Sequence, residues 1–370
     1  MILTAGNHIR QAFGEDAFCA RIGGDEFIVA LAGGKSREEV ELLADQVVQV
    51  LSRDYEVFNE RVPMSASVGV VLYPEHGDTA DEILKNADSA MYAAKACGRN
   101  CWRLYEPSLQ KDAYETMMLT NSLRRALERD EITLHYQPKV RLADLSIDGF
   151  EALMRWNSVE HGFVNPERFI PLAEKSGVIL SLGEWALREA CAFARRLADS
   201  GRKEQRVAVN ISPKQLATTD FIEKIGVILD ESGIEPAQLE LEVTESILIE
   251  SMEESINKLE ALRKMGVNVA LDDFGTGYSS LTYLRRLPVG TLKIDKSFIA
   301  GILDDLKQAE YVGFIIDLAH ALKLEVVAEG AENQAQVEKL RQYKCDCFQG
   351  YVFSPPVPAD AAERLLWRKN

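Results

Sequence analysis

The stretch Val267-Asn268-Val269-Ala270-Leu271-Asp272-Asp273 is a short apolar run that ends in two adjacent carboxylates. From about Ile132 onward, similar runs alternate with amphipathic helical patterns such as Leu182 to Leu197. This alternation is typical of parallel β/α architecture. The predicted strands are Ile132–Gln137, Gly149–Arg155, Arg206–Ile211, Leu239–Thr244, Val267–Asp272, Thr291–Ile294, Leu324–Ala328 and Asp346–Gln349. Eight such strands in roughly 240 residues predict a TIM-like (β/α)8 barrel.

Polar side chains stand at or near the end of every predicted strand. In chain order they are Gln137, Glu151 with Arg155, Asn210, Glu242, Asp272 with Asp273, Lys293, Glu329 and Gln349. In a barrel of parallel strands these ends converge on one face, where the active sites of this fold lie. Chance readily places a polar residue after one strand, but not after eight in succession. The pattern therefore predicts an active site at that face.

The candidate metal ligands all offer oxygen. They are Glu151, Asn210, Glu242, Asp272, Asp273 and Glu329, with no histidine or cysteine beside them. Such a set favours Mg²⁺ or Mn²⁺ over zinc. Adjacent carboxylates repel each other unless cations neutralise them, and two ions roughly 4 Å apart would activate a water for in-line displacement at phosphorus. With Lys293 as an added positive charge, the constellation predicts phosphodiester hydrolysis.

Each of these residues also has a structural interpretation. A single carboxylate after a strand is more often a helix cap, a single lysine is usually solvated, and Asn210 could be a turn residue. Their joint occurrence favours the functional interpretation. The segment Asp272 to Tyr278 contains two glycines but lacks the spacing and lysine of a Walker loop. We interpret it as a mobile loop beside the metals.

The N-terminal part predicts a separate, smaller domain. Residues 1–103 show the periodicity of helix, hairpin, helix, strand, helix, strand, with the hairpin turn at Gly23-Gly24-Asp25-Glu26. Apolar residues at helical spacing from Ser108 to Glu131, after Pro107, predict a connecting helix. The predicted domains are 1–103, a connector over 104–130, and the barrel over 131–370.

Composition excludes some functions. A formal charge of −16 argues against binding of long nucleic acid, which needs a broad basic face. No apolar run approaches the roughly 20 residues that cross a bilayer, and the N-terminus lacks the features of a secretory signal. The six cysteines lack zinc or disulfide spacing and are interpreted as reduced packing residues. We expect a cytoplasmic chain with no membrane segment of its own, although a longer parent could be membrane-anchored.

The barrel segment resembles a known family. Glu151-Ala152-Leu153 looks like the signature of EAL-type c-di-GMP phosphodiesterases, and the resemblance extends over about Leu123 to Leu366. Further motifs in matching order are Tyr136-Gln137-Pro138, Asn210-Ile211-Ser212, Glu240-Leu241-Glu242-Val243-Thr244-Glu245, Asp272-Asp273-Phe274-Gly275-Thr276-Gly277, Lys293-Ile294-Asp295, Ala328-Glu329-Gly330 and Gln349-Gly350-Tyr351. Ala331 stands where the family usually has valine, which changes no chemistry.

The resemblance implies a role for each candidate residue. The six oxygen ligands would hold two metals, Glu151, Lys293 and Glu329 would act in catalysis with Lys293 contacting the nucleophilic water, and Glu245 would brace the loop that starts at Asp273. The substrate c-di-GMP would be lined by Gln137, Leu153, Arg155, Glu332 and Gln349. Arg155 would hold a phosphate through its fork of donors. The implied product is linear pGpG, with Mg²⁺ or Mn²⁺ as cofactor and Ca²⁺ inhibitory. A homodimer through the EAL domain is a further expectation.

The first segment resembles the later half of a GGDEF diguanylate cyclase domain. The resemblance rests on Arg21-Ile22-Gly23-Gly24-Asp25-Glu26-Phe27, Ser67-Val68-Gly69 and the run from Ala87 to Asn100. Because elements that supply a metal-binding aspartate and the guanine-reading residues are not found in it, we expect no cyclase activity. The sequence leaves three functional hypotheses open. They are a phosphodiesterase, a c-di-GMP receptor without catalysis, and an N-terminal segment that serves as a docking surface.

Overall fold

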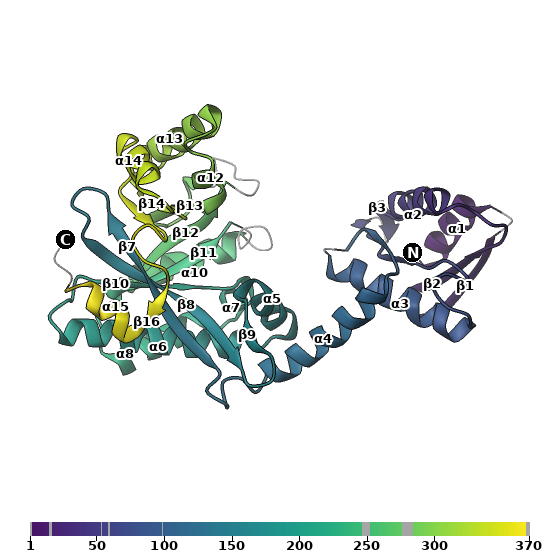
Figure 1. Ribbon diagram of the computed structural model, residues 1–370, viewed down its shortest axis with the longest axis horizontal. Coiled ribbons are helices and arrows are strands. Elements are labelled where there is room, and N and C mark those ends of the chain that lie inside the picture. Colours follow the sequence, from purple (N-terminus) through teal and green to yellow (C-terminus); the bar gives the residue numbers. More distant parts are fainter. Residues whose placement is uncertain are drawn as a thin grey trace. The chain divides into compact units, whose positions relative to one another are not determined.

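The computed structural model describes residues 2–14, 17–52, 54–57, 60–97, 99–245, 252–275 and 284–367. The chain forms two compact units, Met1–Met118 and Leu119–Asn370 (Figure 1). No helix among the described residues has the length and apolarity that a membrane crossing requires.

The first unit is a small α/β fold built on hairpins and short pairs of strands. Its elements are α1 (Ile2–Phe13), β1 (Ala17–Gly23), β2 (Glu26–Leu31), α2 (Arg37–Leu51), β3 (Asp54–Val57), β4 (Glu60–Pro63), β5 (Val68–Val70), α3 (Ala80–Ala96) and β6 (Trp102–Leu104). The predicted hairpin is present: β1 and β2 pair antiparallel, and Gly24 at the turn has φ 53°, which favours glycine. The pairs β3–β4 and β5–β6 form two further sheets. The β3–β4 hairpin was not predicted.

The predicted connecting helix is shorter than its apolar periodicity suggests. Helix α4 covers Pro107–Leu123, whereas the prediction continued to Glu131. Past Leu123 the chain continues in turns and reaches Asp130, which has φ 54°. Leu119, Leu123 and Ala126 of this segment belong to the second unit and share a buried cluster with Trp156 and Phe169. Their spacing therefore reflects packing against the barrel rather than a continued helix.

The second unit is the closed eight-stranded barrel that the sequence predicted. Its strands are β7 (Ile132–Arg141), β8 (Ile147–Ser158), β10 (Arg206–Asn210), β11 (Leu239–Thr244), β12 (Asn268–Phe274), β13 (Thr291–Ile294), β14 (Glu325–Glu329) and β15 (Cys347–Gln349). Neighbours follow chain order from β8 to β15, and β7 closes the barrel by pairing with both β15 and β8. Short strands β9 (Gly162–Val164) and β16 (Val357–Pro358) extend the sheet.

One strand departs from the predicted parallel arrangement. β7 pairs antiparallel with β8 and with β15, while β8 and β10 to β15 are mutually parallel. Only residues 142–146 separate β7 from β8. Such a short connection closes a hairpin, whereas a parallel crossover needs a dozen or more residues. Gln137 thus lies within an antiparallel strand and not at the end of a parallel one.

Helices cover the outside of the barrel. They are α5 (Pro166–Ser176), α6 (Ile179–Asp199), α7 (Pro213–Ala217), α8 (Phe221–Ser232), α10 (Met252–Lys264), α12 (Lys296–Ala300), α13 (Leu306–Ala321), α14 (Gln334–Gln342) and α15 (Ala359–Leu365), with a 3-10 turn η1 (Pro236–Gln238). Helix α6 confirms the predicted amphipathic segment. It buries Leu182, Ala186 and Leu197 among others, at the spacing of one helical face.

The cysteines are all free thiols, but they do not share one environment. Cys191, Cys345 and Cys347 are buried in the barrel domain, as expected of packing residues. Cys97 is exposed, so the prediction that every cysteine is a packing residue is wrong for this one. It follows α3 directly as its C-terminal cap residue. A cap position at the surface does not require a buried side chain.

Candidate active site in the barrel

The inward face of β8 presents three of the predicted site residues. Glu151, Leu153 and Arg155 alternate along the strand and so share one face of it. Glu151 is only 4% exposed, and its carboxylate accepts hydrogen bonds from Asn210 Nδ2 at 2.6 Å and from Gln349 Nε2 at 2.6 Å. Strands β8, β10 and β15 therefore place their polar residues together.

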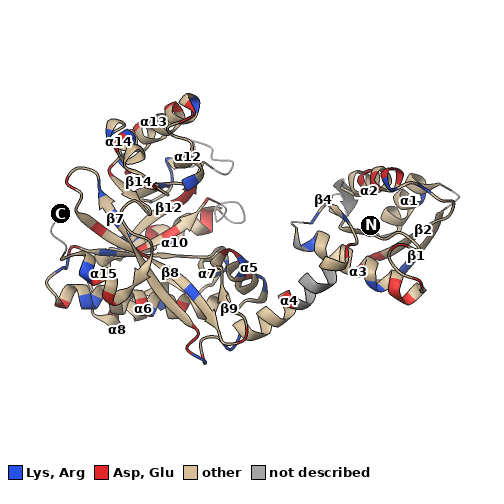
Figure 2. Ribbon diagram, viewed as in Figure 1, with Lys and Arg blue, Asp and Glu red and all other residues tan. Residues whose placement is uncertain are grey.

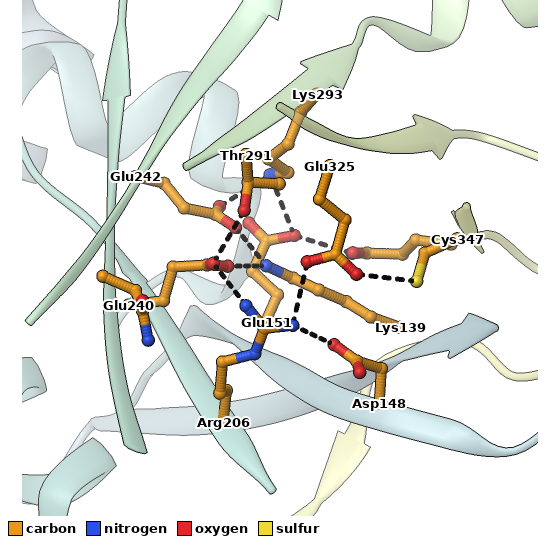
Figure 3. A network of polar contacts seen from close by, with 12 residues as sticks. Lys139, Asp148, Glu151, Arg206, Glu240, Glu242, Thr291, Lys293, Glu325 and Cys347 are labelled. Carbon is orange, nitrogen blue, oxygen red and sulfur yellow. Dashed lines mark hydrogen bonds and ion pairs between the residues drawn. The ribbon is translucent and has the colours of Figure 1, made fainter. Parts of the chain in front are cut away.

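Lys293 lies at the centre of the cluster. Its side chain is fully buried, and its Nζ contacts carboxylate oxygens of four residues at 2.6 to 3.5 Å, of which Figure 3 labels Glu242 and Glu151. These are Glu242 at 2.6 Å, Glu329 at 2.7 Å, Asp272 at 3.1 Å and Glu151 at 3.5 Å. A buried charge needs such compensation. The structure thus brings together strands β8, β11, β12, β13 and β14 around one ammonium group.

Two overlapping groups of carboxylates could each hold a cation. Ligand oxygens of Glu151, Glu242 and Asp272 lie within 4.8 Å of one another, and so do those of Asp272, Asp273 and Glu329. Asp272 belongs to both groups. This all-oxygen donor set, with a shared carboxylate, fits a pair of hard divalent ions such as Mg²⁺ or Mn²⁺.

The interpretation as helix caps can be tested where the structure describes the cap of the helix that follows a strand. Asn210 does not cap the helix that follows it, because Ser212 is the N-cap of α7 and forms a capping box with Gln215. Asp295 caps α12 and Asn333 caps α14. Other residues therefore cap the helices that follow β10, β13 and β14. The carboxylates of Glu151, Glu242, Asp272 and Glu329 instead contact the buried Lys293.

The protonation of the cluster is strongly perturbed. Burial, reinforced by neighbouring carboxylates, raises the pKa of Glu151 to about 7 and that of Glu329 to about 8. Burial also raises the pKa of Asp272 and of Asp273. Burial alone would raise the pKa of Glu242 as well, but two adjacent lysines lower it to about 2. The buried carboxylates thus outnumber the lysines beside them. Bound cations would supply the missing positive charge and favour the ionised form of these carboxylates.

A second lysine was missed by the sequence prediction. Lys139 of β7 is buried, and its Nζ lies 2.5 Å from Glu240 Oε1 and 2.7 Å from Glu242 Oε1 (Figure 3). The predicted strand stopped at Gln137, two residues short of it. A signal was present: polar residues alternate with apolar ones through Gln137 and Lys139 in β7, and through Glu240 and Glu242 in β11. Period-2 alternation places such residues on one face.

A third group of ligand types lies at the opposite end of the barrel. Asp148, Glu325 and Cys347 have ligand atoms within 4.8 Å of one another. Arg206 contacts Asp148 at 2.7 Å and Glu325 at 3.0 Å, and Arg141 also pairs with Asp148. The guanidinium groups already neutralise these carboxylates, so this is an ion-pair network and not a metal site.

The remaining predicted residues border the cluster. Gln137 accepts a hydrogen bond from Gln349 at 2.9 Å, and Gln349 Oε1 is buried with no hydrogen-bond partner among the described residues. Arg155 is partly buried, and burial lowers the pKa of its guanidinium. Glu332 is exposed just after β14. Glu245 Oε1 accepts a hydrogen bond from the main-chain N–H of Gly275 at 3.1 Å, where a brace of the following loop would be.

The predicted mobile loop cannot be compared with the structure, because residues 276–283 lie outside the described part of the chain. The described part of this segment, 272–275, begins with Asp272 and Asp273 at the end of β12; Figure 2 draws the acidic residues of the chain in red.

Fold and site together define an α/β barrel protein with a buried cluster of carboxylates that could hold metal ions. The chain belongs to the EAL domain family, whose profile matches residues 120–356. Residues 1–101 match the profile described as diguanylate cyclase, GGDEF domain.

Relatives with assigned names support this placement. Bifunctional diguanylate cyclase/cyclic di-GMP phosphodiesterase MucR of Pseudomonas aeruginosa is 41% identical over 360 residues, which cover 97% of this chain and 52% of MucR. Cyclic di-GMP phosphodiesterase PdeR of Escherichia coli is 38% identical over 355 residues, covering 96% and 53%. The chain therefore spans about half the length of these relatives.

One solved structure is matched over almost its whole length by this chain. The PaMucR phosphodiesterase in complex with c-di-GMP is 44% identical and superposes with a TM-score of 0.64, covering 66% of this chain and 99% of that one. The barrel fold that the strand pattern predicts is thus confirmed by the solved structure of a relative.

Proposed function

We propose that the barrel hydrolyses c-di-GMP to linear pGpG with two divalent ions. The observation that carries this proposal is the presence of two clusters of three carboxylates, which have Asp272 in common and lie beside the buried Nζ of Lys293. The barrel of the PaMucR phosphodiesterase binds c-di-GMP, and the sequences named above carry phosphodiesterase names. These similarities support the choice of substrate.

The chain's own residues have distinct tasks in this proposal. Glu151, Asn210, Glu242, Asp272, Asp273 and Glu329 would hold the ions. When bound, Mg²⁺ or Mn²⁺ supplies Lewis-acid charge and lowers the pKa of bound water. Lys293, fixed by four carboxylates, would donate hydrogen bonds to the nucleophilic water and stabilise negative charge in the transition state.

Substrate binding would use the residues beyond the carboxylates. Arg155 shares the face of β8 with Glu151 and offers a fork of donors suited to a phosphate. The buried Gln349 Oε1 lacks a hydrogen-bond donor in the described structure, and a bound ligand would supply one. Leu153, Gln137 and Glu332 complete the proposed lining.

The test is hydrolysis of c-di-GMP by the purified chain with Mg²⁺, followed by chromatography of the products. Conversion to pGpG is expected for the wild type, and loss of at least about 100-fold in turnover for Glu151→Ala. Glu184→Ala is a matched control, because Glu184 is a surface residue of α6 that pairs with Arg188. Tight c-di-GMP binding by the wild type without turnover would instead support a receptor.

The rest of the chain is assigned by the same proposal. Residues 1–103 would form a GGDEF-like domain without cyclase activity, and 104–130 would connect it to the barrel over 131–370.

A homodimer through the barrel domain is supported by exposed apolar side chains of α13, where Leu306 is 71% and Phe314 is 58% exposed. Contiguous exposed apolar surface often marks an interaction site. Phe314→Glu should shift the sedimentation of a dimer to that of a monomer.

A further inference from the structure

Lys139 occupies a position that the proposed mechanism does not use. It faces the barrel interior from β7, on the same side as Gln137, and only 5% of its side chain is exposed. Its ammonium group joins two carboxylates of β11, contacting Glu240 Oε1 and Glu242 Oε1. Glu242 is a proposed metal ligand and Glu240 is not.

Both oxygens of Glu242 are held by lysines from different strands. Lys139 contacts Oε1 at 2.7 Å, and Lys293 contacts Oε2 at 2.6 Å. A carboxylate held at both oxygens cannot rotate freely about its terminal torsion. Lys139, on the Oε1 side, therefore helps to fix the orientation of the whole Glu242 carboxylate. This orientation sets where its oxygens lie relative to those of Glu151 and Asp272.

Lys139 is itself anchored from the other side. Glu240 Oε1 contacts its Nζ, while Glu240 Oε2 accepts a hydrogen bond from Thr291 at 3.2 Å and lies 3.6 Å from Arg206. Charges therefore alternate along the barrel interior from Arg206 through Glu240, Lys139 and Glu242 to the cation site (Figure 3).

We propose that Lys139 is a positioning residue for divalent-cation binding, which acts by fixing the orientation of the Glu242 carboxylate. The inference rests on the proposed function, in that Glu242 must be a ligand. Partners that orient a metal ligand typically contribute 10-fold to 100-fold to metal affinity. Lys139 meets the geometric condition for such a partner, because it touches the ligand and lies outside the ligand group.

A merely structural role must be separated from this one. Lys139→Met removes a buried ammonium and leaves Glu240 without one of its partners, so it should lower the unfolding midpoint as well as cation affinity. The double variant Lys139→Met/Glu240→Met removes the ion pair as a whole and replaces it with apolar side chains of similar volume. Such replacement is often neutral or stabilising. It restores stability while Glu242 still lacks its second lysine.

The experiment measures Mn²⁺ binding to chelator-stripped protein by electron paramagnetic resonance, together with urea unfolding midpoints. We expect the double variant to unfold near the wild-type midpoint and to bind Mn²⁺ at least about 10-fold more weakly. Arg141→Met is the control: it removes another cation of β7, whose side chain is 52% exposed and which pairs with Asp148 and not with Glu242. It should leave Mn²⁺ affinity within about twofold of the wild type.

Two results would overturn the inference in distinguishable ways. If the double variant binds Mn²⁺ as tightly as the wild type, Lys139 is structural while the proposed cation site stands. If Glu151→Ala binds Mn²⁺ as the wild type does, or if the wild type binds none, the proposed cation site is wrong and the inference is wrong with it. Weak Mn²⁺ binding by both Lys139 variants, against unchanged binding by Arg141→Met, supports the positioning role.

Discussion

The main-chain N–H of Asp273 donates a hydrogen bond to Oδ1 of Asp272 at 2.9 Å, within a register shift of β12. Consecutive side chains of a regular strand point to opposite faces, so two adjacent aspartates would not normally serve one site. Asp273 has φ 55°, in the left-handed region. This irregular backbone allows oxygens of both aspartates and of Glu329 to come within 4.8 Å of one another.

Asp273→Gly is predicted to separate stability from activity. A non-glycine residue with positive φ carries a cost of about 1 kcal/mol, which glycine avoids at the price of greater unfolded-state entropy. The variant should therefore unfold within about 1 kcal/mol of the wild type, while c-di-GMP hydrolysis falls by at least about 100-fold. Urea unfolding and product chromatography measure the two effects.

Asp130→Gly is the control for that variant. Asp130 has nearly the same backbone conformation, with φ 54°, but lies in the turn before β7 and outside the cluster. Its replacement should leave both stability and hydrolysis close to the wild type. Full activity of Asp273→Gly would remove Asp273 from the set of proposed ligands.

The strands were predictable because each is a short apolar run bounded by polar residues. The observed bounds of β11 and β13 are those predicted, and β10 differs by one residue at its end. The direction of β7 was not predictable from its own residues, since alternation reads the same in both directions. The short connection over 142–146 held that information.

The candidate site was predictable to the extent that strand ends define it. Glu151, Asn210 and Glu242 lie together as expected, because parallel strands bring their ends to one face. The partnership of Lys139 with Glu240 was not predictable, since it joins strands 101 residues apart in the chain. The positive φ of Asp273 was not predictable either, because no residue type in β12 indicates it.

Calcium should support substrate binding without turnover. The proposed ligands form a compact set of oxygens, which suits an octahedral ion with bonds of roughly 2.0–2.1 Å. Ca²⁺ prefers roughly 2.3–2.6 Å and more ligands, and would displace the nucleophilic water from its position. Chelator-stripped protein with Ca²⁺ should bind c-di-GMP in calorimetry but yield no pGpG. Activity in Ca²⁺ equal to that in Mg²⁺ would argue against a tight two-ion site.

The 370-residue chain, assayed as it stands, is predicted not to synthesise c-di-GMP. Joining two GTP molecules requires metal-bound phosphates in line with a 3′-hydroxyl. Asp25 and Glu26 sit exposed at the β1–β2 turn. Among the described residues, every grouping of three candidate ligands lies in the barrel unit instead. The assay supplies GTP and Mg²⁺ to Glu151→Ala, and steady formation of c-di-GMP would contradict the prediction.

The stability of the metal-free protein should fall as pH rises from about 5 to about 8.5. The pKa of Glu151 is raised from an ordinary 4.5 to about 7 and that of Glu329 to about 8, chiefly by burial. Within this window the folded state holds protons that the unfolded state has released. Each such proton lowers the unfolding free energy by up to about 1.4 kcal/mol per pH unit. Urea midpoints in chelator, taken across the window, measure the trend.

Glu242 acts in the opposite sense and in a different range. Lys139 and Lys293 outweigh the effect of burial and lower its pKa to about 2, so its contribution is present above about 4.5 and is lost as pH falls toward about 2. The fall above pH 5 is therefore specific to the acids with raised pKa. The double variant Glu151→Gln/Glu329→Gln should flatten it, while Mg²⁺ should stabilise the wild type more at high pH than at low pH. A slope unchanged in the double variant would assign the pH dependence to other groups.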